Sequence, residues 1–280
     1  MDAASIDCTT DGNAVKKVAG FPGATAMNSN LSDKEFRDWN EQMMRIHDNE
    51  AFHSNSNWLV HSLASLRVAE ILRLLQCGPE DTALDVGCGA GIILNQLTAR
   101  EKTGVDLCTR MLERARIRCG SQTKLVEASA EHLPFGAHSF SRVLCSEVIG
   151  HVQSPEFVVR EVHRVLKPDG VLVVTVPASL RVVAIKQWLK RLGLYTLLLG
   201  SRKKGVYCPP ANDDWYLHHF SPRSLKALLG TCFEVQDVSC VPNRLFPIHY
   251  IFHCRPKMLR VPNEAPTLKV VPAVAATCHV

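Results

Sequence analysis

Several features that mark particular classes of protein are absent from this chain of 280 residues. The 11 cysteines form no C-x-x-C pair and show no zinc-ligand spacing, so we expect no metal site. No uncharged apolar run approaches the roughly 20 residues that a membrane-spanning helix needs. The start of the chain lacks the basic and apolar regions of a cleaved secretion signal. We therefore expect a cytoplasmic protein with reduced thiols.

A strong charge of one sign is also missing. The 32 Lys and Arg against 27 Asp and Glu leave a formal net charge of +5. This excess is too small to indicate a dedicated nucleic-acid-binding protein, so we expect no nucleic-acid partner. It is compatible with anionic small molecules or an anionic membrane surface. With 46% hydrophobic and 21% charged residues, the composition is typical of one globular domain with accessory segments.

Short apolar strands alternate with helical segments through the middle of the chain. We expect strands at 83–86, 103–106, 124–127, 141–145 and 171–176, and helices at 91–98, 109–119 and 155–166. Units of this kind build a parallel sheet with helices on both faces and a functional surface at the carboxyl ends of the strands. Lys167 to Gly170 is expected to be a turn with glycine at positive φ.

The remaining segments flank this unit. We divide the chain into a flexible tail at 1–30, a helical cap at 31–78 with a helix over 58–76, a core at 79–177, an insertion at 178–220, a C-terminal part of the core sheet at 221–256 and a flexible tail at 257–280. Ser221 is expected to cap a helix with Pro222 at its first position. Two strands, 233–238 and 249–254, should then form a hairpin at the sheet edge.

A glycine-rich loop follows the first strand, in the order Asp85-Val-Gly87-Cys88-Gly89-Ala-Gly91. Alternate glycines let the backbone turn sharply and approach a ligand, with helix N-terminal amides facing it. A second acid, Asp106, ends the next strand, where its carboxylate can accept hydrogen bonds from both hydroxyls of a ribose. The alternative for Asp106 is the N-cap of the helix over 109–119.

The segment from Leu84 to Gly91 resembles the first motif of class I S-adenosylmethionine (SAM)-dependent methyltransferases. Its G-x-G-x-G spacing differs from the G-x-G-x-x-G of dinucleotide-binding loops and favours SAM over NAD. Segments 128–135 and 161–170 are also similar to the family. The resemblance implies an α/β, Rossmann-like fold with a seven-stranded, mostly parallel sheet, helices on both faces, SAM as cofactor and S-adenosylhomocysteine as product.

The resemblance also implies a set of cofactor contacts. Asp85 and the glycine-loop backbone would hold the amino acid end of SAM, Asp106 the ribose, and the 128–131 turn with Leu107 the adenine. Ser129 stands where the family usually has Asp, and the alternative for Glu131 is a solvated turn. The full implied set is Asp85, Gly87, Cys88, Gly89, Gly91, Asp106, Leu107, Ser129, Ala130, Glu131, Cys145 and Ser146, with Glu147 as a further cofactor-side candidate.

His151, after the fourth strand, is the leading candidate for a general base, because a histidine of near-neutral pKa can remove a hydroxyl proton. The alternative is a loop histidine with only local hydrogen bonds, since positioning supplies much of the catalysis of methyl transfer. Tyr216 and His219 are secondary candidates for contacting the acceptor. Relatives often have a similar aromatic and histidine run in one wall of the acceptor pocket.

The insertion at 178–220 mixes apolar and basic residues between 180 and 205. This pattern predicts an amphipathic acceptor lid that covers an apolar substrate or rests on anionic headgroups as a peripheral membrane contact. The alternative is a plain helix packed on the sheet. We expect methyl transfer to an O or C atom of an apolar small molecule, such as a polyketide, isoprenoid, quinone precursor or lipid-like compound.

Three other functions stay open at this stage. Arsenite methyltransferases share the resembled fold and hold the metalloid with cysteines, for which Cys145 and Cys208 are candidates. A second alternative is a non-catalytic SAM-binding or partner-binding module. A nicotinamide oxidoreductase is the third, and the glycine spacing argues against it.

Overall fold

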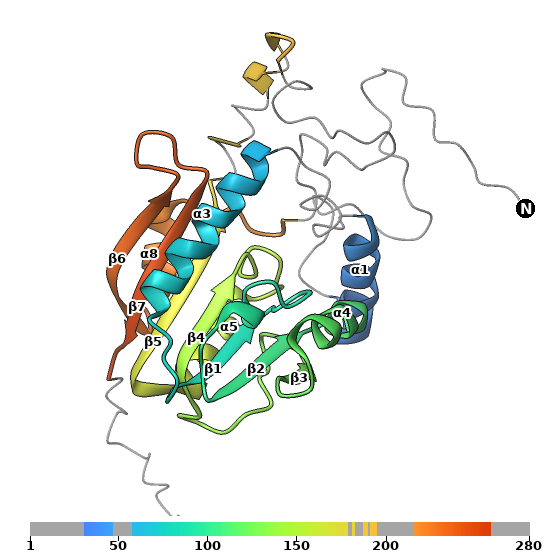
Figure 1. Ribbon diagram of the computed structural model, residues 1–280, viewed down its shortest axis with the longest axis vertical. Coiled ribbons are helices and arrows are strands. Elements are labelled where there is room, and N and C mark those ends of the chain that lie inside the picture. Colours follow the sequence, from blue (N-terminus) through green and yellow to red (C-terminus); the bar gives the residue numbers. More distant parts are fainter. Residues whose placement is uncertain are drawn as a thin grey trace, which may run out of the picture.

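A seven-stranded sheet forms the centre of the part of the chain that the computed structural model describes, residues 31–46, 58–178, 181–182, 187–189, 191–194 and 216–258. The strand order is β3-β2-β1-β4-β5-β7-β6 (Figure 1). Strands β1 to β5 run parallel, whereas β7 is antiparallel to both β5 and β6. The strands are β1 Thr82–Val86, β2 Glu101–Asp106, β3 Lys124–Glu127, β4 Phe140–Ser146, β5 Leu166–Pro177, β6 Phe233–Val241 and β7 His249–Pro256. The predicted mostly parallel sheet is confirmed.

Helices cover both faces of the sheet (Figure 1). The helices are α1 Asp33–Ile46, α3 Trp58–Leu75, α4 Thr109–Cys119, α5 Pro155–Val165 and α8 Pro222–Leu229. Helices α3 and α4 pack in one core with Leu144 of β4, and α5 and α8 pack in another with Val143. Adjacent strand residues point to opposite faces, so each strand contributes to both cores. The fold is therefore a three-layered α/β sandwich.

Helix α8 begins as the sequence predicts. The Ser221 hydroxyl accepts a hydrogen bond from the Ser224 amide at 3.1 Å, and Pro222 occupies the first turn, where its missing amide proton costs nothing. The Ser224 hydroxyl in turn accepts a hydrogen bond from the Ser221 amide, which completes a capping box.

Two local predictions are wrong. The segment 91–98 is not an α-helix but contains only the 3-10 turn η2 Leu94–Gln96, because Gly91 is left-handed at φ +74° and Leu97 is already extended. The segment 167–170 belongs to the irregular start of β5, and Gly170 is not at positive φ. A Cβ at Gly170 would lie 2.6 Å from Leu166, so glycine is needed there for close packing.

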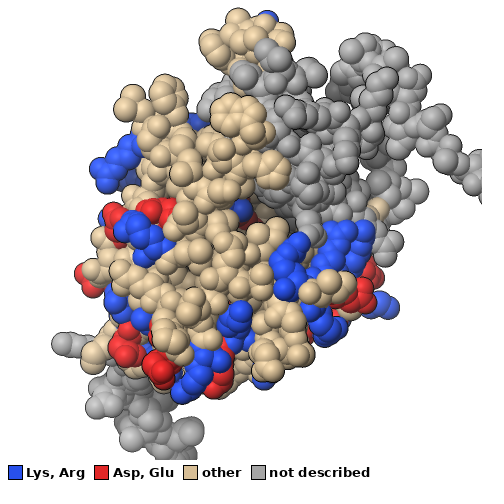
Figure 2. Space-filling view, viewed as in Figure 1, with Lys and Arg blue, Asp and Glu red and all other residues tan. Residues whose placement is uncertain are grey.

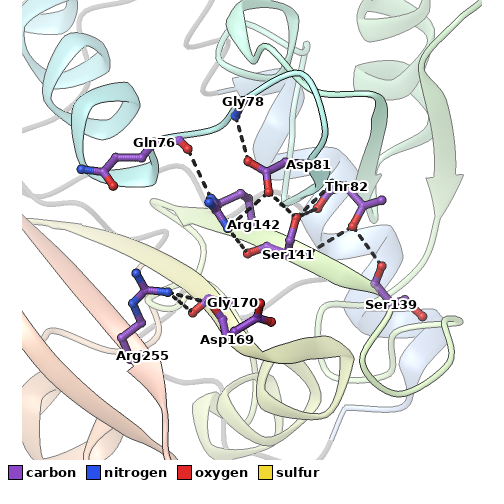
Figure 3. Close-up of polar contacts among 10 residues, drawn as sticks. All are labelled: Gln76, Gly78, Asp81, Thr82, Ser139, Ser141, Arg142, Asp169, Gly170 and Arg255. Atoms are coloured by element: carbon purple, nitrogen blue, oxygen red, sulfur yellow. Dashed lines mark hydrogen bonds and ion pairs between the residues drawn. The ribbon is translucent and has the colours of Figure 1, made fainter.

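Asp81 organises a polar network at the amino edge of the sheet (Figure 3). Its carboxylate accepts hydrogen bonds from the Gly78 amide and the Ser141 hydroxyl, both at 2.8 Å, and lies 3.3 Å from Arg142 Nη1. Burial alone would raise the pKa of Asp81, but these hydrogen bonds and the nearby cations hold it below its usual value. The network fixes the start of β1 against the start of β4.

Candidate active site

The glycine loop lies at the opposite, carboxyl edge of the sheet. Gly87, Gly89 and Gly91 all have left-handed φ values, between +52° and +74°. A Cβ at Gly87 would lie 2.1 Å from Val148 Cγ2, so the exit loop of β4 presses directly against this turn. A Cβ at Gly89 would meet no described atom within 4 Å. Gly87 thus permits internal packing, and Gly89 presents bare backbone to open space.

Two carboxylates flank this loop. Asp106, at the end of β2, accepts hydrogen bonds from the Gly89 amide at 2.8 Å and the Cys108 amide at 2.9 Å. A carboxylate offers about four acceptor positions, so Asp106 keeps capacity for a further donor. Asp85, inside β1, is only 3% exposed and accepts no hydrogen bond from the residues that the structure describes. Burial and the charge of Asp106 raise the pKa of Asp85 to about 8.

Glu147 is the centre of a second polar cluster, where β4 and β5 end. Its backbone is left-handed at φ +61°, which is uncommon for a residue with a side chain. The carboxylate accepts hydrogen bonds from Thr175 Oγ1 at 3.0 Å and from the Tyr216 hydroxyl at 3.4 Å. Arg67 Nη1, from α3, lies 3.5 Å from the same carboxylate.

Charges around Glu147 keep it ionised. Burial would raise the pKa of this carboxyl, but the positive charges of His249 and Arg67, the Thr175 hydrogen bond and His151 together hold it below its ordinary value. The site therefore contains a fixed negative charge beside two histidines.

His151 lies against Tyr216, with ring centroids 4.0 Å apart, and is only 8% exposed. The amides of Leu217 and His218 both donate to the Gly150 carbonyl, at 2.9 and 3.0 Å. A Cβ at Gly150 would lie 2.8 Å from the Tyr216 ring. The absence of a side chain at Gly150 therefore lets the segment before α8 dock on the exit loop of β4 and brings Tyr216 onto His151.

Comparisons with known proteins agree with this geometry. Residues 84–174 match the model of a family described as a methyltransferase domain. The chain is 33% identical over 184 residues to a ubiquinone biosynthesis O-methyltransferase of Haemophilus ducreyi, which covers 56% of this chain and 74% of that protein. The chain belongs to the class I SAM-dependent methyltransferases. It is an enzyme of that class, and its cofactor is SAM.

Two further proteins show how far the similarity extends. A malonyl-[acyl-carrier protein] O-methyltransferase of Legionella pneumophila is 35% identical over 115 residues, but the match spans only 39% of this chain and 40% of that protein. The crystal structure of the [4+2]-cyclase SpnF superposes with a TM-score of 0.57 at 17% identity, over 78% of this chain and 96% of SpnF. At this identity the likeness shows the fold alone.

The residues present fit SAM, which carries a sulfonium and an ammonium against one carboxylate and is a net cation. Asp85 and Asp106 repel each other in the absence of a cation, and a positively charged ligand would offset that repulsion. Gly89 gives the backbone the close approach that such a ligand needs. A dinucleotide fits less well, because its anionic phosphates would face two carboxylates. Asp85 at the amino acid end and Asp106 at the ribose stay predictions.

The alternative for Asp106 is wrong as stated. The N-cap of α4 is Cys108, which makes no side-chain cap. Asp106 instead accepts a hydrogen bond from the Cys108 amide while it holds the glycine loop. Leu107, between these residues, is partly exposed, and its adenine contact stays a prediction.

The turn after β3 has a structural role that the sequence does not reveal. Glu131 is on a turn and partly exposed, but its carboxylate also accepts hydrogen bonds from the Gln153 and Ser154 amides at 2.7 and 3.0 Å, at the start of α5. The Ser129 hydroxyl accepts a hydrogen bond from the Glu131 amide at 3.2 Å. The adenine contacts of Ser129, Ala130 and Glu131 stay predictions.

Two predicted cysteine contacts involve buried side chains. Cys145 is 1% exposed in the core between β4 and α5, where burial raises the pKa of its thiol to about 12. Cys88 is buried in the other core, and its amide donates to the Val105 carbonyl. These thiols pack against protein, so cofactor contact at either position would have to use the backbone. Ser146, at the end of β4, lies 3.0 Å from Thr175 Oγ1 and is partly exposed.

The structure brings together His151 and Tyr216 but leaves His219 at the rim, exposed and with its ring 5.9 Å from that of Tyr216. Their catalytic roles stay predictions. Sequence reasoning missed Arg67, Thr175 and His249. The only available signal was a cation on the apolar face of the helix at 58–76.

The prediction of a lid at 178–220 lies largely outside the described residues, as do both expected tails and Cys208. Among the residues that the structure describes, no group of three or more His, Cys, Asp and Glu side chains could hold a metal ion. No helix in those same ranges is long and apolar enough to cross a bilayer.

Proposed function

We propose that this methyltransferase acts on a hydroxyl oxygen of an apolar small molecule. The observation that carries the proposal is the His151 and Tyr216 pair beside the Glu147 carboxylate, on a loop that touches the glycine loop through Val148 and Gly87. His151, the proposed proton acceptor, therefore lies on the loop that contacts the glycine loop. Both relatives described above are named as O-methyltransferases, which supports oxygen over carbon as the target.

Different residues of this chain would have different roles in methyl transfer. SAM, when bound, supplies a methyl group made electrophilic by the sulfonium. His151 would take the proton of the acceptor hydroxyl, because it is mostly shielded from water and lies beside an ionised carboxylate. Tyr216 would hold the imidazole ring and form one wall of the acceptor site, with His219 at its outer rim. Placement of the hydroxyl in line with the methyl group supplies the rest of the rate.

An apolar acceptor is supported by apolar side chains on the surface near this edge. Figure 2 shows few charged side chains over the first half of α3 and the turn between β6 and β7, where Trp58, Leu66, Leu245 and Phe246 are exposed. Trp188, in the described part of the insertion, is 61% exposed. Such a surface and the basic residues of 180–205 favour a lid at 178–220 that contacts an apolar acceptor or a membrane interface. We place this enzyme in the cytoplasm or at the face of a membrane.

The first test is cofactor binding, followed by turnover. SAM and S-adenosylhomocysteine should raise the melting temperature and bind in titration calorimetry, and NAD should do neither. The enzyme is then assayed with methyl-labelled SAM against a panel of 4-nonylphenol, geranylgeraniol and arsenite. We expect label on the phenol or the isoprenoid alcohol and none on arsenite.

A His151→Ala variant separates chemistry from binding. We expect its turnover to fall by about 100-fold while SAM affinity stays unchanged, since removal of a general base typically costs two to four orders of magnitude. Normal turnover in this variant would remove the general-base role. SAM binding without transfer to any acceptor would instead support the non-catalytic module, and methylated arsenic would support the thiol-based alternative.

A further inference from the structure

Arg67 is an unusual residue in its helix. Ile71 and Leu75 lie one and two turns further along α3 and are fully buried against the sheet. Residues four positions apart share a helix face, so Arg67 continues this apolar face toward the carboxyl edge. A charged side chain in such a position is costly unless it is paired.

The pairing of Arg67 is incomplete. Its Nη1 lies 3.5 Å from Glu147 Oε1, with side chains 17% and 21% exposed. Its Nε is buried and has no hydrogen-bond partner among the described residues. A buried ion pair often stabilises a fold no better than apolar side chains of the same size. Stability alone therefore gives a poor account of an arginine in this position.

Glu147, the ion-pair partner of Arg67, has an unusual backbone conformation. Its left-handed backbone at φ +61° is held by a hydrogen bond from its amide to the Thr175 carbonyl at 3.2 Å. Such strained conformations concentrate at functional sites, where neighbouring structure holds them. The carboxylate then reaches Thr175 and Arg67 with one oxygen and the Tyr216 hydroxyl with the other.

We propose that Arg67 is a positioning residue of the acceptor site, which fixes the Glu147 carboxylate so that Tyr216 holds the His151 ring in its reactive orientation. This inference rests on the function proposed above, but its structural part does not. Arg67 lies outside the matched methyltransferase domain at 84–174, so a helix of the N-terminal cap would complete the acceptor site.

The test compares Arg67→Ala and Arg67→Lys with Arg73→Ala as a matched control. Arg73 is on the same helix, exposed, and bonded to Glu70 through two 2.7 Å hydrogen bonds far from the cluster. A misplaced catalytic group lowers the rate by about 100-fold. We expect kcat with the best acceptor of the panel to fall by that factor in Arg67→Ala, with SAM affinity unchanged. Arg67→Lys should recover part of the loss, because lysine restores the charge but not the planar fork.

A pH profile gives a second reading of the same variants. Loss of Arg67 should raise the pKa of Glu147. The acid side of the kcat profile should then show, besides the limb of the His151 base, a limb from protonation of Glu147 that moves to higher pH. The other groups that face Glu147 are His249 from β7, His151 on the β4 exit loop, and the Tyr216 and Thr175 hydroxyls. A limb that shifts in Arg67→Ala and disappears in Glu147→Gln belongs to Glu147.

A measurement without turnover keeps the inference separate from the proposed function. The His151 ring lies 4.0 Å from that of Tyr216, so its NMR resonances should carry a ring-current shift in the wild type. We expect this shift to persist in Arg73→Ala and to diminish in Arg67→Ala and Glu147→Gln. Unchanged His151 resonances in Arg67→Ala, or a kcat no lower than in Arg73→Ala, would overturn the positioning role. Absence of methyl transfer to every acceptor would overturn only the proposed function, and the NMR result would still decide on Arg67.

Discussion

The two edges of the sheet differ in how many hydrogen-bond partners they provide for a carboxylate. At the amino edge, Asp81 has an amide, a hydroxyl and a guanidinium as partners, and its pKa is lowered. Four residues later, at the carboxyl edge, Asp85 accepts no hydrogen bond from the described part of the chain, and its pKa is raised to about 8. Asp81 stabilises the fold, whereas Asp85 is costly to ionise until a ligand supplies the missing partner. We propose that the incomplete edge is the one that binds SAM.

Gly87→Ala should give the largest loss of stability, because the added Cβ disrupts the packing of the glycine loop against the β4 exit loop. A left-handed residue with a Cβ costs about 1–2 kcal/mol, and overpacking against Val148 adds about 1–3 kcal/mol. We expect a loss of about 4 kcal/mol in the free energy of unfolding, measured by urea denaturation. Gly89→Ala is the matched control, since its Cβ would meet no described atom within 4 Å. That variant should fold but lose SAM affinity, and equal stability of the two variants would contradict the distinction.

Asp106→Ala should abolish measurable SAM binding. Each hydrogen bond to a charged group is worth about 1.5–3 kcal/mol, so loss of two ribose contacts predicts an affinity at least 100-fold lower. Titration calorimetry measures the affinity, and circular dichroism checks the fold. Unchanged affinity would show that the ribose assignment is wrong.

Asp81→Ala should lower stability and leave SAM affinity nearly unchanged. It leaves the Gly78 amide, the Ser141 hydroxyl and Arg142 without their shared acceptor, and we expect a loss of about 2 kcal/mol in stability. SAM affinity should remain within about threefold of the wild type, because the substitution does not touch the carboxyl edge. A loss of SAM binding in a folded Asp81→Ala protein would remove the proposed separation of the two edges.

Asp85→Asn should change the free energy of unfolding in the opposite direction, toward greater stability. With a folded pKa of about 8 against 3.8 when unfolded, native Asp85 holds a proton that the unfolded chain has lost between these pH values. Its contribution to stability therefore falls as pH rises from about 4 to 8. The cofactor-free Asn variant should lack this decline and be more stable than the wild type at pH 8, by thermal denaturation. A steeper decline in the variant would contradict the raised pKa.

The sequence predicts the proximity of the glycine loop, Asp85 and Asp106 better than it predicts the cluster around Glu147, and the reason is physical. The glycine loop, Asp85 and Asp106 occupy two consecutive strand ends, so their proximity follows from the parallel sheet alone. Arg67, Glu147 and Tyr216 come from three distant segments, and their contact depends on packing details such as the missing side chain at Gly150.

Local features that the sequence does not predict also depend on contacts between distant segments. Asp-Gly at 169–170 has the composition of a turn, but these residues lie in the bulged start of β5, where the register with β4 passes from Leu166 to Val171 and the Leu166 side chain packs against Gly170. The sequence also gives no sign that the Glu131 carboxylate accepts hydrogen bonds from two amides 22 and 23 positions away. Such partners cannot be read from neighbouring residues.

The most direct test of the incomplete carboxyl edge is calorimetric titration of SAM into the wild-type protein at pH 7, in two buffers of different ionisation enthalpy. Asp85 is mostly protonated at this pH if its pKa is about 8, and a bound cation favours its ionised form. The account predicts SAM binding with release of about one proton, and no proton release in Asp85→Asn. Absence of SAM binding, or binding of equal proton stoichiometry in both proteins, would contradict it.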